Sequence, residues 1–481
     1  MKTARCPALF LTAPSSGQGK TTVTASLARL LQRQGKIVRV FKTGPDYLDP
    51  QILQQASGQP VEQLDLWMAG ESYCQQMLFD AAQQADIILV EGAMGMFDGD
   101  PSSADLAAKF SIPLAIVMDV KGMAQTAAAV VTGLANFRSD INVAGLLANN
   151  CGSDRHRELI ENALPPHLPL IASLKRADDV TLPERHLGLV QASEVTEQLE
   201  RCFEAGADWL ETAGINNFIS ALQPVVFQHP EIESTKLSRF ELLLSQQPLA
   251  NKTIAIAKDA AFSFIYQSNV QMLQELGANI TYFSPLADRQ LPAADALWFP
   301  GGYPELHTRA LSENHALLSE LNTFFEQDKP ILAECGGLLY CLQTLTDLDG
   351  VSFPLAGLIT GHGSMRGKRG CQGMQTAQLP EGDVRAHAHH RSRSHDTPAP
   401  IAHGKRQKHP APGEAIYRQR HLTATYLHLF FPSNPDAIAA LFNPQFATSA
   451  FTQTQYAKAP EDEINAKTAN KIAGISNVAG E

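Results

Sequence analysis

The chain has 481 residues, a formal net charge of −11 at pH 7, and a composition that is 44% hydrophobic and 18% charged. These values are ordinary for a globular protein with at least two domains, and the acidic balance does not favour nucleic acid as a partner. No apolar run approaches the roughly 20 residues that a membrane-spanning helix needs, so we expect no membrane association. Seven cysteines are scattered without a CxxC pair, which predicts reduced thiols and a cytoplasmic location.

The first 190 residues alternate apolar, strand-like runs with helical stretches. Such alternation is typical of a parallel, doubly wound α/β sheet with helices on both faces, and it predicts a first domain over residues 1–195. Functional side chains of such a sheet gather at the carboxyl ends of its strands. The predicted strands are Ala8–Thr12, Ile37–Lys42, Ile87–Glu91, Leu114–Asp119 and Val143–Asn149.

A glycine-containing loop, APSSGQGKTT, follows the first predicted strand and precedes a helix predicted over residues 22–34. It fits the phosphate-loop pattern at its GKT end, although Pro14 stands where the pattern has its first glycine. Backbone amides at the helix start can face an anion, the lysine can reach terminal phosphates, and the threonine hydroxyl can bind Mg²⁺. An ordinary turn is the alternative. The residues assigned to ATP are Gly17, Gly19, Lys20, Thr21 and Thr22.

Carboxylates follow two neighbouring predicted strands. The segment KTGPDYLDP offers Asp46 and Asp49, and the segment EGAMGMFDG offers Glu91 and Asp98. Strands of one parallel sheet end at the same edge, so these groups should converge beside the phosphate loop. We predict that Asp46 and Glu91, with Thr21, hold Mg²⁺. For Asp49 and Asp98, a direct role and an ordinary role in turns and helix caps stay open.

A second strand–helix alternation predicts another α/β domain over residues 251–445. Residues 196–250 read as a helical connector, 385–413 as a long loop rich in histidine and arginine, and 446–481 as a disordered tail. The loop is open to three interpretations: a solvated segment, a metal site, or recognition of substrate carboxylates by Arg385, His387 and His390. The predicted strands are Thr253–Lys258, Ile280–Phe283, Ala296–Pro300, Ile331–Glu334 and Thr423–Leu429.

The segment PILAECGGLLY, residues 330–340, places Cys335 between an apolar strand and a glycine-led helix. A thiol at such a turn lies at a helix N-terminus, which favours the thiolate, and this is the pattern of a cysteine nucleophile. His428, in an apolar strand, is the candidate base. Backbone amides of the PGGYPE turn, at Gly302, and of Gly336 can form an oxyanion hole. A buried structural cysteine, as we expect for Cys341, is the alternative.

Together these segments resemble the cobyrinate (or hydrogenobyrinate) a,c-diamide synthases, over about residues 4–441. The resemblance rests on APSSGQGKTT, KTGPDYLDP, VEGAMGMFDG, NNCGSDRH, LPERHLGL, FPGGYPELH, AECGGLLY and YLHLFFPSNP. It implies an N-terminal P-loop domain similar to dethiobiotin synthetase and a C-terminal class I glutamine amidotransferase domain of flavodoxin-like fold. It also implies amidation of two corrin carboxylates through an acyl phosphate. The implied substrates are ATP, glutamine and a corrinoid, and the implied cofactor is Mg²⁺.

The resemblance adds residue roles. It implies that Asn149 lies near the adenine, that Tyr47, Asp49 and Asp98 handle substrate or phosphate, and that Cys335 and His428 release ammonia from glutamine. Two departures stand out. Phe430 occupies the position where ordinary class I amidotransferases carry a glutamate, so we expect modest glutamine turnover and use of free ammonia. The segment AHAHHRS, residues 386–392, differs from the family's usual GHxFHxS.

Several alternatives remain at this stage. Cobyric acid synthases and nickel-sirohydrochlorin a,c-diamide synthases are related ligases with other substrates. A partitioning ATPase of the ParA/MinD type would share the nucleotide loop, but it would lack the cysteine elbow. An inactive amidotransferase with a regulatory role would not need to retain Cys335 and His428. The sequence leaves open the cobalt content of the corrin, the order of amidation and the oligomeric state, a homodimer included.

Overall fold

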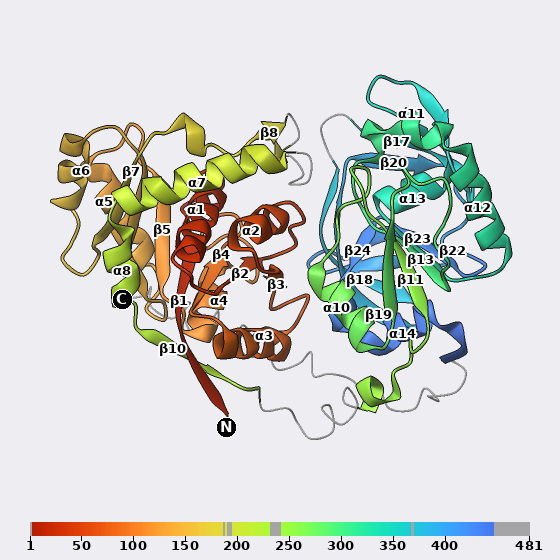
Figure 1. Cartoon of the computed structure of the whole chain (residues 1–481), viewed down its shortest axis with the longest axis horizontal. Helices are drawn as coiled ribbons and strands as arrows, with labels where there is room; N and C mark the ends of the chain where they lie inside the picture. Colours follow the sequence, from red (N-terminus) through yellow and green to blue (C-terminus); the bar gives the residue numbers. More distant parts are fainter. Residues whose placement is uncertain (1, 186–187, 190–194, 231–241, 367–369, 447–481) are drawn as a thin grey trace, which may run out of the picture.

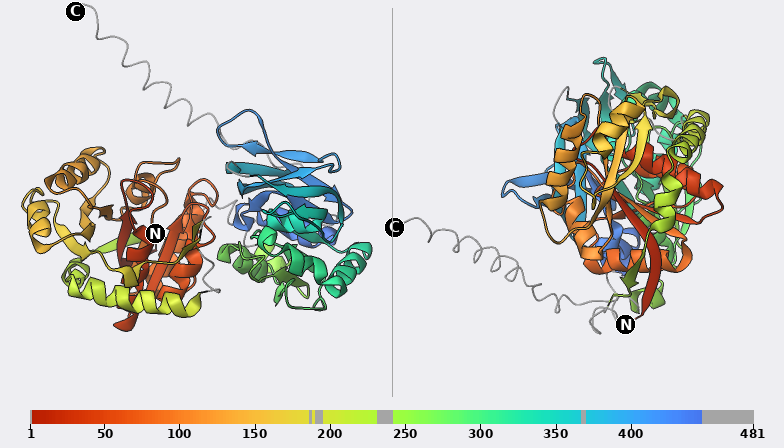
Figure 2. Two further views of the ribbon diagram at one scale, coloured as in Figure 1. Left: turned by 90° about the horizontal axis from the view of Figure 1, so that it is seen from above. Right: turned by 90° about the vertical axis from the view of Figure 1, so that its left-hand side faces the viewer.

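The computed structural model describes residues 2–185, 188–189, 195–230, 242–366 and 370–446. It consists of two α/β units that lie side by side, one built from the N-terminal half of the chain and one from the C-terminal half (Figures 1 and 2). Residues 447–481, which include almost all of the predicted tail, lie outside the described residues. Among the described residues, none of the helices is both long and apolar enough to cross a membrane.

The N-terminal unit is built on a parallel sheet with the strand order β3-β2-β4-β1-β5-β6-β7. A further strand, β10 (Pro224–Gln228), pairs antiparallel with the beginning of β1. The parallel strands are β1 (Thr3–Thr12), β2 (Val38–Thr43), β3 (Glu62–Leu64), β4 (Ile87–Glu91), β5 (Leu114–Asp119), β6 (Val143–Cys151) and β7 (Leu170–Lys175).

Helices cover both faces of this sheet, as the alternating sequence pattern predicted. One apolar core forms with α1 (Lys20–Arg33), α2 (Asp49–Ser57), α7 (Thr196–Thr212) and α8 (Ile215–Ala221). The other forms with α3 (Glu71–Gln84), α4 (Ser103–Phe110), α5 (Gln125–Asn136) and α6 (Asp154–Glu161). The strands are therefore buried on both sides, which explains their nearly continuous apolar runs. A 3₁₀ turn (Asp178–Val180) and the short strands β8 (Glu184–Arg185) and β9 (Gly188–Leu189) precede α7.

The segment predicted as a connector differs from the sequence expectation in its first half. Helix α7 packs along α1, where Arg29 forms ion pairs with Glu200 at 2.6 Å and Glu204 at 2.8 Å. Leu199 and Phe203 of α7 are buried in the same core. Residues 196–228 thus belong to the N-terminal unit, because the apolar face of α7 completes the layer over the sheet.

The C-terminal unit contains a mixed sheet with the order β12-β11-β13-β14-β23-β22-β21-β18-β19-β24. The first five strands pair in parallel and the remaining ones antiparallel. The parallel strands are β11 (Thr253–Ala257), β12 (Asn279–Phe283), β13 (Ala296–Phe299), β14 (Ile331–Glu334) and β23 (Leu422–Thr425). Helices α11 (Thr308–Glu313), α12 (His315–Glu326) and α13 (Gly336–Cys341) line one face, and α10 (Gln267–Glu275) and α14 (Pro435–Phe442) the other.

The prediction of a long loop over residues 385–413 was wrong. The structure has β19 (Gly382–His390), β20 (Ser392–His395), β21 (Ala402–Arg406) and the beginning of β22 (Pro412–Gln419) in this region. Both β19 and β21 pair with the preceding strand β18 (Cys371–Leu379), and β24 (Leu427–Leu429) directly continues the path of β23. Alanines alternate with polar residues along β19, and the buried positions include Ala386 and Ala388. The many charged and histidine side chains obscured this period-two pattern, which marks a strand.

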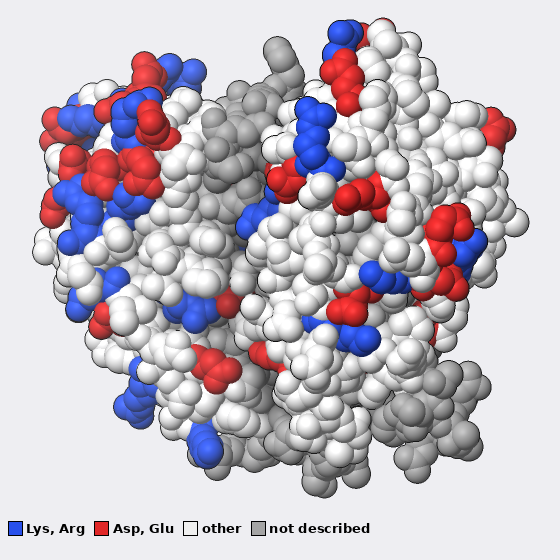
Figure 3. All heavy atoms as spheres, turned by 45° about the vertical axis from the view of Figure 1, so that its right-hand side comes forward, with Lys and Arg blue, Asp and Glu red and all other residues white. Residues whose placement is uncertain are grey.

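A small second sheet lies beside the nucleophile helix α13. It consists of β15 (Leu342–Thr346), β16 (Ser352–Pro354), β17 (Ile359–Met365) and β20 (Ser392–His395), in the order β16-β15-β17-β20. Two 3₁₀ turns, Pro304–Leu306 and Phe431–Ser433, complete the unit. On the face drawn in Figure 3, cationic and anionic side chains lie close to one another and leave wide uncharged areas between them.

An aromatic cluster joins the two units. Tyr47 of the N-terminal unit packs with Phe264, Tyr266 and Phe430 of the C-terminal unit, and all four side chains are buried. The Tyr266 hydroxyl donates a hydrogen bond to the Tyr47 hydroxyl at 2.8 Å. The interface is therefore apolar at its centre, with its polar atoms paired, which favours a defined arrangement of the two units.

Candidate active sites

The phosphate loop ends β1 and leads into α1, as predicted. Gly17 and Gly19 adopt φ values of 78° and 90°, a region that favours glycine. A Cβ atom on Gly19 would lie only 2.4 Å from Nδ2 of Asn149, so the loop also needs glycine there for space. The Asn149 amide donates to the Gln18 carbonyl at 3.0 Å. Asn149 is thus held directly against the loop, and its place near the adenine stays a prediction.

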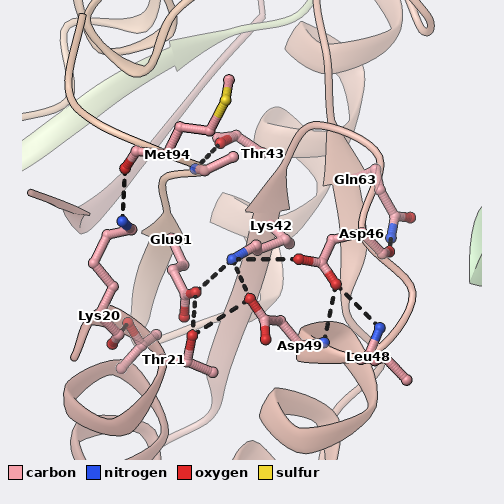
Figure 4. A network of polar contacts seen from close by, with 12 residues as sticks. Lys20, Thr21, Lys42, Thr43, Asp46, Leu48, Asp49, Gln63, Glu91 and Met94 are labelled. Carbon is pink, nitrogen blue, oxygen red and sulfur yellow. Dashed lines mark hydrogen bonds and ion pairs between the residues drawn. The ribbon is translucent and has the colours of Figure 1, made fainter. Parts of the chain in front are cut away.

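Lys20 is buried at the start of α1, and its ammonium donates to the Met94 carbonyl at 2.6 Å. Thr22 follows in the first turn of α1. The Asp98 carboxylate accepts the backbone amide of Gly95 at 3.2 Å, in the loop that also carries Met94. Lys20 of the phosphate loop therefore contacts the loop after β4, which also carries Asp98 (Figure 4).

The central group of this site is Lys42, which the sequence analysis did not single out. Its ammonium lies 2.5 Å from Asp49 Oδ2 and 2.5 Å from Glu91 Oε1. It also lies 3.8 Å from Asp46 Oδ2 (Figure 4). The Thr21 hydroxyl donates to Glu91 Oε1 at 2.9 Å. Three of the four predicted carboxylates and the predicted threonine thus meet around one buried lysine at the end of β2.

Charge balance explains this cluster. Burial alone would lower the pKa of Lys42, but Asp49 and Glu91 outweigh it, so the pKa of Lys42 is raised and the side chain is a cation. Burial alone would raise the pKa of Asp49, yet the ion pair with Lys42 lowers it overall. Burial also raises the pKa of Glu91, against the opposing effect of Lys42. The carboxylates can lie together because Lys42 compensates part of their charge.

The same residues fit a divalent cation only in part. Glu91 Oε2 is buried without a hydrogen-bond partner, so an oxygen ligand is available beside the Thr21 hydroxyl, and both are ligand types that Mg²⁺ accepts. Asp46 likewise has one oxygen engaged, because its Oδ1 atom accepts the backbone amides of Leu48 and Asp49, both at 3.0 Å. Its Oδ2 atom lies 3.8 Å from the Lys42 ammonium. Thr21, Glu91 and Asp46 therefore each offer an oxygen for the predicted metal, beside a lysine cation that opposes a second positive charge.

Replacement of Lys42 by methionine is expected to destabilise the N-terminal unit. The variant keeps the carboxylates of Asp46, Asp49 and Glu91 together without their cation, and loss of one partner of a buried pair costs about 3–5 kcal/mol. Urea unfolding at pH 7 should show this loss. Added Mg²⁺ should recover part of it by replacing the missing positive charge. The exposed Lys36→Met is the matched control and should unfold like the wild type; equal stability of both variants would contradict this account of Lys42.

The second candidate site lies at Cys335, on the turn between β14 and α13. Its backbone has φ 47° and ψ −100°, a strained conformation for a residue with a side chain. A Cβ atom on Gly336 would lie 3.0 Å from the Gly302 nitrogen, so the two predicted oxyanion positions adjoin each other. The strand, the strained turn and the short helix form the elbow that the sequence predicted.

His428 lies in β24 and is fully buried against the glycine turn. A Cβ atom on Gly301 would come within 2.2 Å of the His428 ring, so this contact requires glycine. Both ring nitrogens lack a hydrogen-bond partner among the described residues. Phe430 stands two residues after His428, so no glutamate is available from that position. Glu334, a buried carboxylate of β14, has other partners, because it accepts hydrogen bonds from the Leu429 amide at 2.8 Å and from the Trp298 ring nitrogen at 2.9 Å. No described residue orients the His428 ring by a hydrogen bond.

The pKa values of the pair predict a thiol rather than a thiolate in this state. Burial, followed by the charge of Glu305, raises the pKa of Cys335 far above its usual value. Burial, followed by the neighbouring His387, lowers the pKa of His428 well below its usual value. Both shifts favour the neutral forms, so a thiolate–imidazolium pair does not form at rest.

A test follows from this protonation state. Because only the thiolate reacts, alkylation of Cys335 by iodoacetamide should accelerate by about tenfold per pH unit between about pH 7 and 9, without a plateau. Mass analysis of the peptide that carries Cys335 would measure the rate, in a Cys341→Ser background so that the peptide has one thiol. A rate that is already constant at neutral pH would instead indicate a preformed thiolate.

One segment connects the two sites. Asp46 and Asp49 face Lys42, whereas Tyr47 between them points into the C-terminal unit. The Tyr47 ring lies 4.7 Å from the His428 ring, measured between centroids. Tyr47 was predicted to handle substrate or phosphate. In this structure it lies in the aromatic cluster at the unit interface, beside the second site.

Family comparisons agree with this two-site arrangement. Residues 9–190 match the model of the CobQ/CobB/MinD/ParA nucleotide binding domain, and residues 253–436 match that of the CobB/CobQ-like glutamine amidotransferase domain. The hydrogenobyrinate a,c-diamide synthase of Stutzerimonas stutzeri is 47% identical over 92% of this chain and 100% of its own length. That of Pseudomonas aeruginosa is 46% identical, over 92% and 99%. The cobyrinate a,c-diamide synthase of Herminiimonas arsenicoxydans is 44% identical, over 91% and 97%.

The chain belongs to this family of a,c-diamide synthases. Its N-terminal unit is the nucleotide-binding domain and its C-terminal unit the glutamine amidotransferase domain, as the resemblance implied. The ParA/MinD alternative is excluded by the second domain, because the relatives match the chain over both halves.

Proposed function

We propose that this chain is an ATP- and glutamine-dependent ligase that amidates the a and c acetate carboxylates of cobyrinate or hydrogenobyrinate. The observation that carries this proposal is the segment 46–49, which supplies carboxylates to the nucleotide site and an aromatic ring to the glutaminase site. A ligase of this kind needs both chemistries in one chain, and the substrate follows from the names of relatives at 44–47% identity.

The proposed reaction begins at the nucleotide site. A carboxylate oxygen of the corrin attacks the γ-phosphorus of ATP, the bond to the β-phosphate oxygen breaks, and an acyl phosphate and ADP result. Lys20 would balance the negative charge of the phosphates, and the amides around Gly17 and Gly19 would cradle them. Thr21, Glu91 and Asp46 would hold Mg²⁺, which supplies further charge neutralisation when bound. Asp98 and Asp49 are proposed to position substrate or phosphate.

Ammonia is proposed to come from the second site. The Cys335 sulfur attacks the amide carbon of glutamine, its proton passes through His428 to the leaving nitrogen, and a thioester and ammonia form. The amides of Gly302 and Gly336 would stabilise the oxyanion. Water then hydrolyses the thioester to glutamate. Ammonia attacks the acyl carbon, phosphate leaves, and the amide results; a second cycle amidates the other carboxylate.

The apolar interface supports a sheltered transfer of ammonia. Free ammonia is protonated in neutral water and then no longer nucleophilic, so exclusion of water protects it. The buried cluster of Tyr47, Phe264, Tyr266 and Phe430 adjoins both sites through Tyr47, whose neighbour Asp46 faces Lys42 and whose ring lies 4.7 Å from the His428 ring. Its side chains offer no base or acid that would trap ammonia, apart from the paired tyrosine hydroxyls.

The direct test uses purified full-length protein with ATP, Mg²⁺ and glutamine. Cobyrinic acid and cobalt-free hydrogenobyrinic acid are supplied in separate reactions, and product masses are recorded over time. The proposal predicts two successive exchanges of a hydroxyl for an amino group on at least one of them, with one ATP consumed per exchange. Conversion of nickel sirohydrochlorin alone would assign another macrocycle, and conversion of none would refute the ligase assignment.

A further inference from the structure

A cluster of three metal-ligand side chains lies in the antiparallel part of the C-terminal sheet, outside both sites. Cys371 begins β18, His390 ends β19 and Glu414 lies in β22. One ligand atom from each lies within 4.8 Å of the others. Cys371 and His390 are directly opposed in the β18–β19 register, so the sheet itself sets their separation. Among the described residues, no other group of three histidine, cysteine or carboxylate side chains brings its ligand atoms this close together.

His390 is oriented as a metal ligand would be. Its Nδ1 atom lies 3.2 Å from the Ser392 carbonyl, which can only accept, so Nδ1 carries the proton. The other ring nitrogen, Nε2, then presents a lone pair. A hydrogen bond from one ring nitrogen to a carbonyl is the arrangement that fixes the tautomer of metal-binding histidines.

The nearest group to that lone pair is a carboxylate. His390 Nε2 lies 3.3 Å from Glu414 Oε2, which would be an ion pair with a doubly protonated ring, and Nε2 has no hydrogen bond of good geometry among the described residues. The His390 side chain is only 6% exposed, so water does not readily satisfy it. Two acceptor atoms at this separation repel each other unless a proton or a cation lies between them.

We propose that Cys371, His390 and Glu414 bind a zinc ion, with water as the fourth ligand. Thiolate, imidazole and carboxylate are the ligand types that Zn²⁺ combines, whereas Mg²⁺ and Ca²⁺ avoid sulfur. Burial raises the pKa of the free Cys371 thiol to about 11, so binding releases its proton. Arg406 lies beside the thiol and lowers its pKa, which favours the thiolate but opposes the cation.

The zinc would tie three strands together next to the glutaminase nucleophile. The antiparallel part of the sheet curls back on itself. Its path runs from β22 through β21, β18 and β19 to β24, and β24 follows directly after β23, which pairs with β22. The His390 ring stacks on Tyr426, with centroids 4.0 Å apart, two residues before His428. The neighbouring His389 carbonyl lies 3.8 Å from the Cys335 sulfur. Bound zinc would therefore hold β19, the strand that borders Cys335, in place. This structural role does not depend on which macrocycle the ligase amidates.

Cobalt substitution tests this proposal on the full chain, after tag removal and dialysis against a chelator. Wild-type protein titrated with Co²⁺ should develop a sulfur-to-cobalt charge-transfer band. The same metal-free protein, reloaded with Zn²⁺ and freed of excess metal, should contain about one Zn²⁺ per chain. Cys371→Ser should abolish the band, and Glu414→Gln should weaken zinc binding by at least about tenfold. Cys341→Ser and Cys335→Ser are thiol controls that should retain the band.

Two results would overturn the proposal. One is wild-type protein that binds no zinc and gives no charge-transfer band. The other is a band that survives in Cys371→Ser and disappears in Cys335→Ser, which would place the metal at the glutaminase thiol. Melting of the metal-free variants, compared with metal-free wild type, checks that they fold. Should Cys371→Ser fail to fold, the wild-type stoichiometry and Glu414→Gln still decide the question.

Discussion

The Cys335→Ala variant is expected to lose glutamine-dependent amidation and to keep amidation with ammonium salts. Removal of the nucleophile leaves no thioester route, and loss of such a residue typically lowers turnover by at least about 10³-fold. The nucleotide site does not contain Cys335, so ATP and corrin chemistry should proceed once ammonia is supplied. Product formation is measured in parallel with glutamine and with ammonium chloride. The ratio of the glutamine-dependent rate to the ammonia-dependent rate should fall strongly in the variant.

Cys341→Ala is the matched control for this experiment. Cys341 is a buried thiol at the other end of α13, and it should retain both activities apart from a small loss of stability. Loss of the ammonia-dependent reaction in Cys335→Ala would contradict the division of labour, because it would place Cys335 in the amidation step itself.

Lys20→Ala should have the opposite profile. The variant loses the cation beside the phosphate loop, and removal of one preorganised charge at a reacting phosphate costs about 10²–10³-fold in rate. Amidation should therefore fail with glutamine and with ammonia alike. Glutamine hydrolysis by Cys335 should persist, since Lys20 belongs to the other domain. Assays of glutamate release and of ADP formation separate the two effects.

The exposed Lys36→Ala, which removes the same charge outside the site, is the control and should behave like the wild type. A Lys20→Ala variant that amidates with ammonia at the wild-type rate would contradict the nucleotide role of this lysine. Loss of glutaminase activity as well would instead reveal that the two domains are coupled more tightly than the aromatic interface suggests.

Local sequence patterns predicted both sites because each depends on one short segment. The phosphate loop and the cysteine elbow each join a strand to a helix, and their glycines are required by backbone geometry at Gly19 and by close approach at Gly336. Most of the parallel strands were predicted to within two residues, since burial on both faces makes them continuously apolar. The strands β3 and β7 were missed, β1 begins five residues earlier than predicted, and the last predicted strand is divided into β23 and β24. These features can be read without knowledge of distant contacts.

Other features depend on distant contacts and were not predicted. Lys42 lies in a segment that drew attention for its carboxylates, yet its role appears only when β4 brings Glu91 beside β2. The strands β19, β20 and β21 were hidden by their histidine, arginine and lysine residues. The place of α7 over α1 depends on the burial of its apolar face, with Leu199 and Phe203, and on contacts between residues 171 positions apart, such as Arg29 with Glu200. A possible signal for Lys42 was its position at the end of a buried strand, two residues before a turn.

The central claim is that the amide nitrogen of glutamine reaches the corrin carboxylate within one chain. The most direct measurement supplies glutamine labelled with nitrogen-15 at the amide, ATP, Mg²⁺ and the corrin. The buffer contains unlabelled ammonium in excess over the ammonia that glutamine can release, but below the concentration that supports amidation by ammonium alone. We predict that the diamide product carries the label at both new amides, because ammonia passes between the sites without mixing with solvent. A product that carries only unlabelled nitrogen, with labelled ammonia released to the buffer, would contradict the coupling of the two sites.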